Sequence, residues 1–100
     1  MNLTIVVIDN GGGGIFSFLP QRQVLPHGRF EQLFGTPSDT DPAAVAAAHG
    51  IDVHEVTTVP QLRAMVEAPS TGVRVLVVRT DRDANVAAHD ALHRAVAAAL

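Results

Sequence analysis

The sequence predicts an α/β domain: a three-layer open parallel sheet with flanking helices. Two apolar runs rich in β-branched residues, 3–8 and 73–79, are typical of strands buried in a parallel sheet. Stretches with helical spacing lie between and after them. Alternating strands and helices favour parallel pairing through right-handed crossovers, so we expect the order strand, loop, helix, strand, helix, strand, helix.

Composition narrows the possible classes of function. A chain of 100 residues forms one domain with a modest core. The absence of cysteine excludes a disulfide scaffold and thiolate chemistry, and it suits a cytoplasmic protein. All seven basic residues are scattered arginines, which argues against a nucleic-acid-binding patch. No apolar run approaches the ~20 residues that a membrane span needs.

The first third of the chain contains the first strand, 3–8, and a long irregular region. We expect one helical turn over 15–19, stopped by Pro20. The segment 21–28 is polar and contains breakers, so we expect it to be irregular. Apolar residues spaced i, i+3, i+4 over 30–34 predict a short amphipathic turn.

A helix is expected over 43–49. Asp41 is a plausible N-cap, and Pro42 fits the first helical position because its missing N–H has no partner there in any case. Gly50 is placed to end the helix in the left-handed conformation. The imperfect alternation over 51–56 predicts a short strand.

Thr58 is expected to cap a second helix, whose inner face would carry Leu62, Met65 and Val66. The buried strand 73–79 follows, then a strand-to-helix loop over 80–83. The last helix is expected over 84–99. Its predicted buried stripe consists of Val86, Leu92, Val96 and Leu100. Because a central parallel strand that begins at residue 3 needs neighbours, we expect this chain to be the later part of something larger.

Four consecutive glycines, Gly11–Gly14, follow the first strand. They could form nothing more than a tight turn. They do not form a Walker loop, and Phe16 stands where a dinucleotide fingerprint needs its third glycine. Their position at the carboxyl end of a strand favours an anion, because bare glycine N–H groups can form a cradle for phosphate.

Asp9 and Asn10 precede the glycines and sharpen this interpretation. Magnesium prefers hard oxygen ligands and often shares them with substrate phosphates. The amide oxygen of Asn10 and the main-chain oxygen of Gly12 could reach one ion across a turn. Asp9 alone could be a plain turn residue. The stretch therefore predicts half of a magnesium–diphosphate site.

Several segments carry a family resemblance: LTIVVIDNGGGGIFSFLP, FEQLFGTP, DPAAVAAAHGI, VRVLVVRTDR and NVAAHDAL. Together they resemble the C-terminal end of the SEPHCHC synthases, a family of thiamine-diphosphate enzymes of menaquinone biosynthesis. The resemblance implies that the whole enzyme decarboxylates 2-oxoglutarate on thiamine diphosphate and adds the succinyl unit to isochorismate. It implies an oligomeric transferase that needs Mg²⁺, of which this chain is the later part of the diphosphate-binding domain.

The same resemblance implies roles for particular residues. Asn10 would be the side-chain ligand of the metal and Gly12 its main-chain ligand, and Asp9 replaces an asparagine usual in the family, which leaves open whether it coordinates. Further contacts to the cofactor and the substrate pocket are implied for Gly11, Gly13, Ile15, Phe16 and Leu19. The family's upstream Gly-Asp-Gly motif and its catalytic glutamate are missing, so no catalytic residue is expected here.

Other polar residues are expected to be structural. His89 and His93 have the i, i+4 spacing of zinc sites but lack a third ligand, so helix packing is the plainer interpretation. The segment 81–83 is expected to be a solvated loop with a helix cap, and Arg22 and Arg29 to be solvated at the surface. Surface or cap positions are expected for the isolated histidines His27, His49 and His54.

Two alternatives remain open on the sequence. The chain could be a free-standing phosphate- or nucleotide-binding module with a flavodoxin-like sheet, or one subunit of a split thiamine-diphosphate enzyme. Its expected partners are the remainder of the enzyme or a second copy. Because central strands of an isolated chain would expose edges and faces, we expect dimers or larger species in solution.

Overall fold

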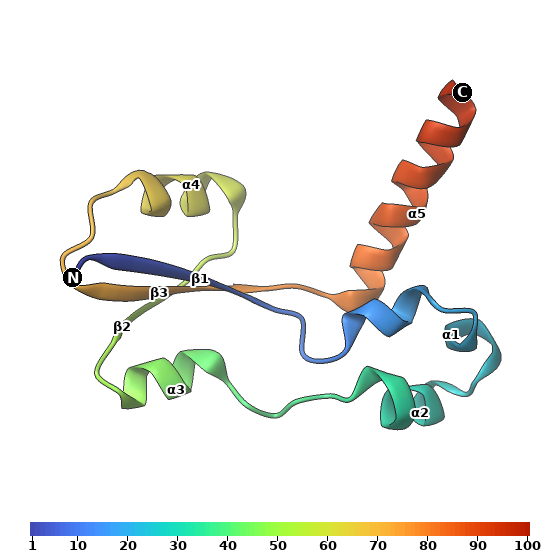
Figure 1. Cartoon of the computed structure of the whole chain (residues 1–100), viewed down its shortest axis with the longest axis horizontal. Helices are drawn as coiled ribbons and strands as arrows, with labels where there is room; N and C mark the ends of the chain where they lie inside the picture. Colours follow the sequence, from blue (N-terminus) through green and yellow to red (C-terminus); the bar gives the residue numbers. More distant parts are fainter. The chain divides into compact units, whose positions relative to one another are not determined.

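The two apolar runs form parallel neighbouring strands, β1 (Leu3–Asp9) and β3 (Val73–Arg79) (Figure 1). A third strand, β2 (Asp52–Glu55), pairs in parallel with the other side of β3, so the order is β1-β3-β2. The computed structural model describes all residues, 1–100. The predicted open parallel sheet is therefore confirmed, with β3 as its central strand.

The chain forms two units. Unit 1 consists of residues 1–9 and 39–79, and unit 2 consists of residues 10–38 and 80–100. In unit 1, α3 (Pro42–Ala48) and α4 (Val59–Glu67) lie on opposite faces of the sheet (Figure 1). Unit 1 therefore has the three expected layers, a helix on each face of a parallel sheet.

The core of unit 1 lies between the sheet and α3. Val75 and Val77 of β3 pack there against Ala46 of α3, and all three are buried. Because side chains alternate along a strand, these odd-numbered residues share one face. Partly buried apolar side chains complete the cluster: Val7, Ala43, Ile51 and Val53.

The opposite face of β3 carries a fully buried Leu76 and a buried arginine, Arg74. The guanidinium of Arg74 donates to the carbonyl oxygens of Met65 and Ala68 at the C-terminal end of α4, at 2.5 and 2.6 Å. Its Nε donates to Thr4 Oγ1 at 2.9 Å. Cations are favourable at helix C-termini, where backbone carbonyls lack partners, so Arg74 ties α4 to the sheet.

The predicted caps of α3 and α4 are confirmed. Asp41 Oδ1 accepts from the N–H of Ala43 at 3.0 Å, and Thr58 Oγ1 accepts from the N–H of Gln61 at 3.3 Å. Gly50 ends α3 with a φ of 71°. The inner face of α4 is only partly as predicted, because Val66 is 52% exposed.

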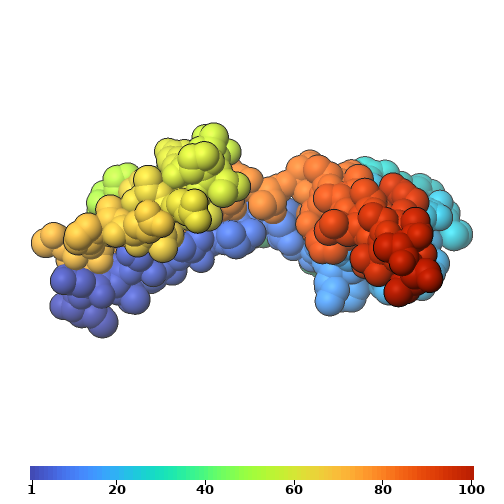
Figure 2. Space-filling view, turned by 90° about the horizontal axis from the view of Figure 1, so that it is seen from above, coloured from blue at the N-terminus to red at the C-terminus, as the bar shows by residue number.

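β1 is an edge strand, and most of its apolar side chains are uncovered. Ile8 is 61% exposed, and exposures near 40% are found for Leu3, Ile5 and Val6. In Figure 2, which is seen from above, the dark blue atoms of β1 lie along one side of unit 1 and are not covered by α4. An apolar edge strand of this kind offers unpaired backbone groups and apolar area to a partner.

Unit 2 begins with four short helical segments. They are η1 (Gly14–Phe18), α1 (Gln21–Val24), α2 (His27–Phe30) and the π-helical turn η2 (Glu31–Gly35). The expectation that 21–28 is irregular was wrong. Pro20 and Pro26 each precede a helical turn, because the fixed φ of proline that stops one helix also suits the start of the next.

An aromatic cluster holds these turns together. Phe30 is fully buried and stacks on Phe34, with ring centroids 5.5 Å apart, and Phe34 contacts Phe16 at 6.0 Å. The guanidinium of Arg22 lies over the Phe30 ring, 5.4 Å from its centroid. The predicted apolar spacing over 30–34 is therefore confirmed for Phe30 and Phe34, whereas Leu33 is 54% exposed.

The long helix α5 (Arg82–Ala99) starts two residues before the predicted 84, with Asp81 as its N-cap accepting from Ala84 N–H at 2.7 Å. The predicted buried stripe was wrong for its C-terminal half. Val86 is half-buried, but Leu92 and Val96 are 62% and 60% exposed, and Leu100 is fully exposed. No helix is long and apolar enough to cross a membrane.

Candidate functional site

The glycine loop of unit 2, residues 10–14, begins with an asparagine turn. Asn10 Oδ1 accepts from the N–H of Gly12 at 3.1 Å, and the carbonyl oxygen of Gly12 accepts from the N–H of Gly14 at 3.0 Å. Gly11 has a φ of 71°, which strongly favours glycine at that position. The side chain of Asn10 is thereby fixed by the loop while the residue stays exposed.

The segment 34–38 supports the loop from behind. The Gly35 carbonyl oxygen accepts from the N–H of Gly13 at 2.6 Å, and the Gly11 carbonyl oxygen accepts from the N–H of Ser38 at 3.2 Å. A β-carbon on Gly12 would collide with the Gly35 carbonyl oxygen, and one on Gly13 would lie 2.7 Å from the Phe34 carbonyl oxygen. Close backbone approach therefore requires glycine at both positions.

The polar atoms of the loop suit a hard cation better than the phosphate cradle suggested by the glycines alone. The N–H groups of Gly12, Gly13 and Gly14 all donate to oxygens within unit 2. Asn10 Oδ1 and the Gly12 carbonyl oxygen each accept a hydrogen bond, and an oxygen of this type has a second lone pair. Magnesium takes oxygen ligands and often completes its shell with phosphate oxygens, so these two oxygens could contribute to a magnesium site.

Asn10 also lines a small polar cavity of about 240 Å³ within unit 2. The other lining residues are His27, Glu31, Thr80, Asp81, Arg82 and Asp83. Most of these side chains carry charge or can titrate, so the amide of Asn10 faces a polar environment. The structure thus brings Asn10 together with residues about 70 positions later in the chain.

Arg82 and Glu31 form a sheltered ion pair at this cavity, with Nη2 to Oε2 at 2.6 Å and side-chain exposures of 18% and 20%. Arg82 Nη1 also donates to the Gly35 carbonyl oxygen at 3.3 Å. The expectation that 81–83 is a solvated loop was therefore wrong for Arg82. Sequence reasoning missed this pair because its members are 51 residues apart and no local pattern links them.

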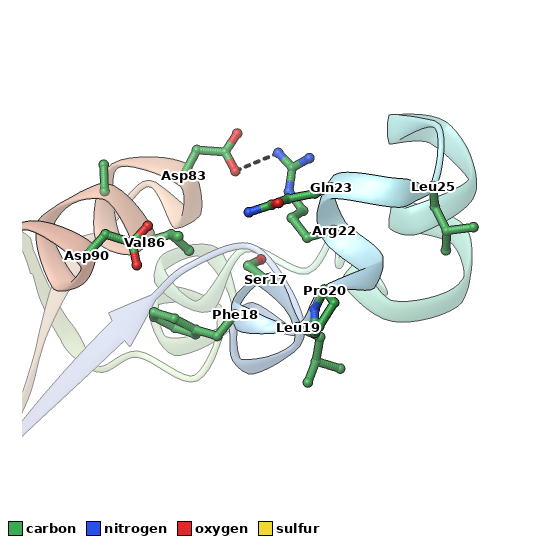
Figure 3. A pocket seen from close by; sticks show the side chains of 11 residues that line it. Ser17, Phe18, Leu19, Pro20, Arg22, Gln23, Leu25, Asp83, Val86 and Asp90 are labelled. Atoms are coloured by element: carbon green, nitrogen blue, oxygen red, sulfur yellow. Dashed lines mark hydrogen bonds and ion pairs between the residues drawn. The ribbon is translucent and has the colours of Figure 1, made fainter. Parts of the chain in front are cut away.

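The apolar residues predicted to line a substrate pocket lie in η1 and just after it. Ile15 is 75% exposed, Phe16 packs on Phe34, and Leu19 lines an open groove of about 870 Å³. Figure 3 shows this groove between η1, α1 and the first turns of α5. The groove therefore contains Leu19 but not Ile15 or Phe16.

Arg22 and Asp83 form an ion pair beside the groove, 2.8 Å from Nη2 to Oδ1 (Figure 3). The hydrogen bond from Arg22 lowers the pKa of Asp83. Because Arg22 also lies over Phe30, the expectation of a solvated arginine was wrong. Arg29 contacts only the turn that follows it, through Gln32 at 3.1 Å.

At the carboxyl edge of the sheet in unit 1, Arg79 binds three carboxylates. Its guanidinium lies 2.9 Å from an oxygen of each of Asp9, Asp41 and Glu55. Hydrogen bonds to Asp41 and Glu55 raise the pKa of Arg79, and the hydrogen bond from Arg79 lowers the pKa of Asp41. The Asp9 carboxylate is thus engaged by Arg79.

The histidines make local contacts within their own elements or with neighbouring rings. His89 and His93 are in edge contact, with ring centroids 6.4 Å apart, and His89 Nδ1 lies 2.9 Å from the carbonyl oxygen of Asn85. His54 is paired with Asp52 at 2.9 Å. No group of three or more His, Cys, Asp or Glu side chains could hold a metal ion. The packing interpretation of His89 is supported by its edge contact with Phe18 at 5.3 Å.

Comparison with known proteins shows which proteins this chain resembles in sequence. No family model matches the chain. A 2-succinyl-5-enolpyruvyl-6-hydroxy-3-cyclohexene-1-carboxylate synthase (SEPHCHC synthase) from Myxococcus xanthus is 46% identical over 99 residues, which are 98% of this chain and 17% of that protein. Proteins of the same name from Listeria monocytogenes and Saccharopolyspora erythraea are 43% and 42% identical, over 100% and 99% of this chain.

The chain spans 17–18% of the length of these relatives. The similarity extends over nearly the whole chain and recurs in relatives from several species. The chain thus matches the C-terminal part of the SEPHCHC synthases.

Proposed function

We propose that this chain is the C-terminal part of a SEPHCHC synthase, a thiamine-diphosphate-dependent transferase of the cytoplasm. The complete enzyme would decarboxylate 2-oxoglutarate and add the succinyl unit to isochorismate. Sequence identity of 41–46% over nearly the whole chain supports the assignment. The task of this part is narrower: it supplies one side of the magnesium–diphosphate site.

The observation that carries this proposal is the oxygen pair of the asparagine turn. Asn10 Oδ1 and the Gly12 carbonyl oxygen are fixed by hydrogen bonds of 3.1 and 3.0 Å, and each keeps a lone pair for an ion. They would hold Mg²⁺ together with oxygens of the diphosphate. At Gly11 an added β-carbon would meet nothing within 4 Å, so there is space beside this residue.

The residues after the loop would wall the pocket. Thiamine diphosphate, when bound, supplies the electron-accepting group that decarboxylation needs. The side chains of Ile15 and Phe16 are exposed in η1 and offer apolar surface to the organic part of the cofactor, and Leu19 offers it to the substrate. Such surfaces exclude water from a reacting group and orient it.

The exposed apolar side chains of β1 and α5 support the proposal that a partner covers these surfaces. The uncovered side of β1 and the last turns of α5 are the kind of surface that a larger protein covers. We propose that the remainder of the enzyme covers them, and that a second copy completes the oligomer. The chain alone would then not turn over substrate.

Complementation tests the proposal directly. The Myxococcus xanthus relative, truncated by its C-terminal part, is mixed with this chain, thiamine diphosphate, Mg²⁺, 2-oxoglutarate and isochorismate. We expect product only when both polypeptides are present. Asn10→Ala should abolish product formation. Asn85→Ala, which changes an exposed asparagine of α5, should not.

Two outcomes would contradict the proposal. Product from the purified chain without the truncated relative would show that the upstream part is not needed. Equal product with Asn10→Ala and with the unaltered chain would show that the asparagine turn holds no metal. Titration with FMN separates the alternative, because tight FMN binding without Mg²⁺ would identify a free-standing nucleotide-binding module instead.

A further inference from the structure

Arg82 contacts two groups at once from the first turn of α5. Its Nη2 donates to Glu31 Oε2 at 2.6 Å, and its Nη1 donates to the Gly35 carbonyl oxygen at 3.3 Å. With 18% and 20% of the two side chains exposed, the pair is largely sheltered from screening by salt. Charge-assisted hydrogen bonds of this kind are short and directional, and the planar guanidinium can hold two acceptors in a fixed arrangement.

Both members of this pair contact Gly35. The Glu31 carboxylate lies directly against its α-carbon, since an added β-carbon would come within 2.5 Å of Oε2. Arg82 Nη1 donates to the carbonyl oxygen of Gly35. In packing this close, Gly35 cannot shift without breaking one of the two contacts.

The Gly35 carbonyl oxygen transmits the restraint to the glycine loop. It accepts the N–H of Gly13 at 2.6 Å. Gly13 lies between Gly12, whose carbonyl oxygen is a candidate ligand, and Gly14, whose α-carbon lies against the Asn10 amide. An added β-carbon on Gly14 would be 2.6 Å from Asn10 Nδ2 and 3.6 Å from Arg82 Cγ. Gly12 is thus the chain neighbour of the restrained Gly13. Asn10 is in contact with Gly14, which is the other neighbour of Gly13.

We propose that Arg82 and Glu31 are a positioning pair for the glycine loop, acting through the carbonyl of Gly35. The pair sets the place of Gly13 and so holds the oxygens of Asn10 and Gly12 where a cation needs them. The cation part of this inference rests on the proposed function, whereas the hold on Gly13 does not. Both residues are positioning residues, because they act through Gly35 and not on the ligand.

The second ion pair of unit 2 provides a matched control. Arg22 and Asp83 also join an arginine to a carboxylate between α5 and the short helices, at 2.8 Å, but neither side chain forms a hydrogen bond with Gly35 or the glycine loop. Loss of either pair removes one cross-link to α5. Only loss of the Arg82 pair should loosen Gly13.

Amide hydrogen exchange of Gly13, followed by NMR on the full chain, tests the hold. In Arg82→Gln we expect Gly13 to exchange at least about 10-fold faster than in Arg22→Gln. Arg82→Lys covers the case in which Arg82→Gln fails to fold. Lysine keeps the charge opposite Glu31, but one ammonium cannot serve both acceptors in the same way, so Gly13 should still exchange faster than in Arg22→Gln. Exchange within about twofold in all three variants would overturn the proposal.

Calorimetric titration of the chain with thiamine diphosphate and Mg²⁺ tests the consequence. We expect the Kd to rise about fivefold or more in Arg82→Lys and to stay within about twofold in Arg22→Gln. If Gly13 exchange responds but the Kd does not, positioning for the cation is overturned. If the unaltered chain binds no cofactor, the proposed function fails, and Gly13 exchange still decides whether the pair holds the loop.

Discussion

Replacing Gly35 with alanine puts a methyl group where the Glu31 carboxylate lies. The added carbon would be 2.5, 2.7 and 2.8 Å from Oε2, Cδ and Oε1 of Glu31. To reach ordinary contact distance the carboxylate must retreat by about 1 Å. It cannot do so freely, because Arg82 Nη2 holds Oε2 at 2.6 Å and both side chains are largely buried.

The cost can be worked from these contacts. Overpacking of a tight site costs about 1–3 kcal/mol, and a strained hydrogen bond to a charged group costs about 1.5–3 kcal/mol. These two costs do not simply add, because a movement of Glu31 that relieves the clash also lengthens its ion pair with Arg82. We therefore expect Gly35→Ala to lower the free energy of unfolding by about 2–4 kcal/mol, a large part of the stability of a small domain.

Urea unfolding followed by far-ultraviolet circular dichroism measures this change. Gly28→Ala is the matched control, since an added β-carbon there meets nothing within 4 Å and alanine favours the helix α2. The double variant Gly35→Ala with Glu31→Ala removes the clashing carboxylate, so the two changes should not add. Equal stability of Gly35→Ala and Gly28→Ala, or strict additivity in the double variant, would refute the reasoning.

Three further predictions concern unit 1. Arg74→Leu should lower the free energy of unfolding by about 2–4 kcal/mol, because it leaves the carbonyls of α4 unpaired. Arg63→Gln, which removes only an exposed ion pair, should lower it by about 0.5 kcal/mol or less. Similar losses of stability in the two variants would contradict this prediction. Since Arg79 lowers the pKa of Asp41, their pair should stabilise the fold above the ordinary value of 3.8 and lose this effect as the pH falls below it. The stability gap between the unaltered chain and Arg79→Gln should then narrow in acid, and a gap constant down to pH 2 would count against it. Ile8→Lys should reduce self-association of the isolated chain in sedimentation velocity, and unchanged association would exclude β1 as the contact.

Much of the fold could be predicted because its signals are local. The β-branched runs mark β1 and β3, and a cap followed by proline marks the start of α3. The short helices α1 and α2 were missed because each is a single turn, for which proline is both a stop and a start signal.

The partners of charged residues could not be predicted. Arg74 lies inside an apolar strand, and its acceptors are main-chain carbonyls, which no sequence pattern identifies. The sequence of α5 has an apolar stripe, but Leu92, Val96 and Leu100 are exposed, so helical periodicity alone did not predict which side chains are buried. The asparagine turn, by contrast, was predictable, because Asn10 and the glycines are adjacent and interact locally.

The most direct test of the proposed site uses Mn²⁺ in place of Mg²⁺, with thiamine diphosphate, on the ¹⁵N-labelled chain. Paramagnetic broadening in NMR spectra reports which amides lie near the ion. We predict that the side-chain amide of Asn10 and the N–H groups of Gly12 and Gly13 broaden first, and that Asn10→Ala removes the effect. Broadening confined to residues around Asp41 and Glu55, with the glycine loop unaffected, would contradict the account.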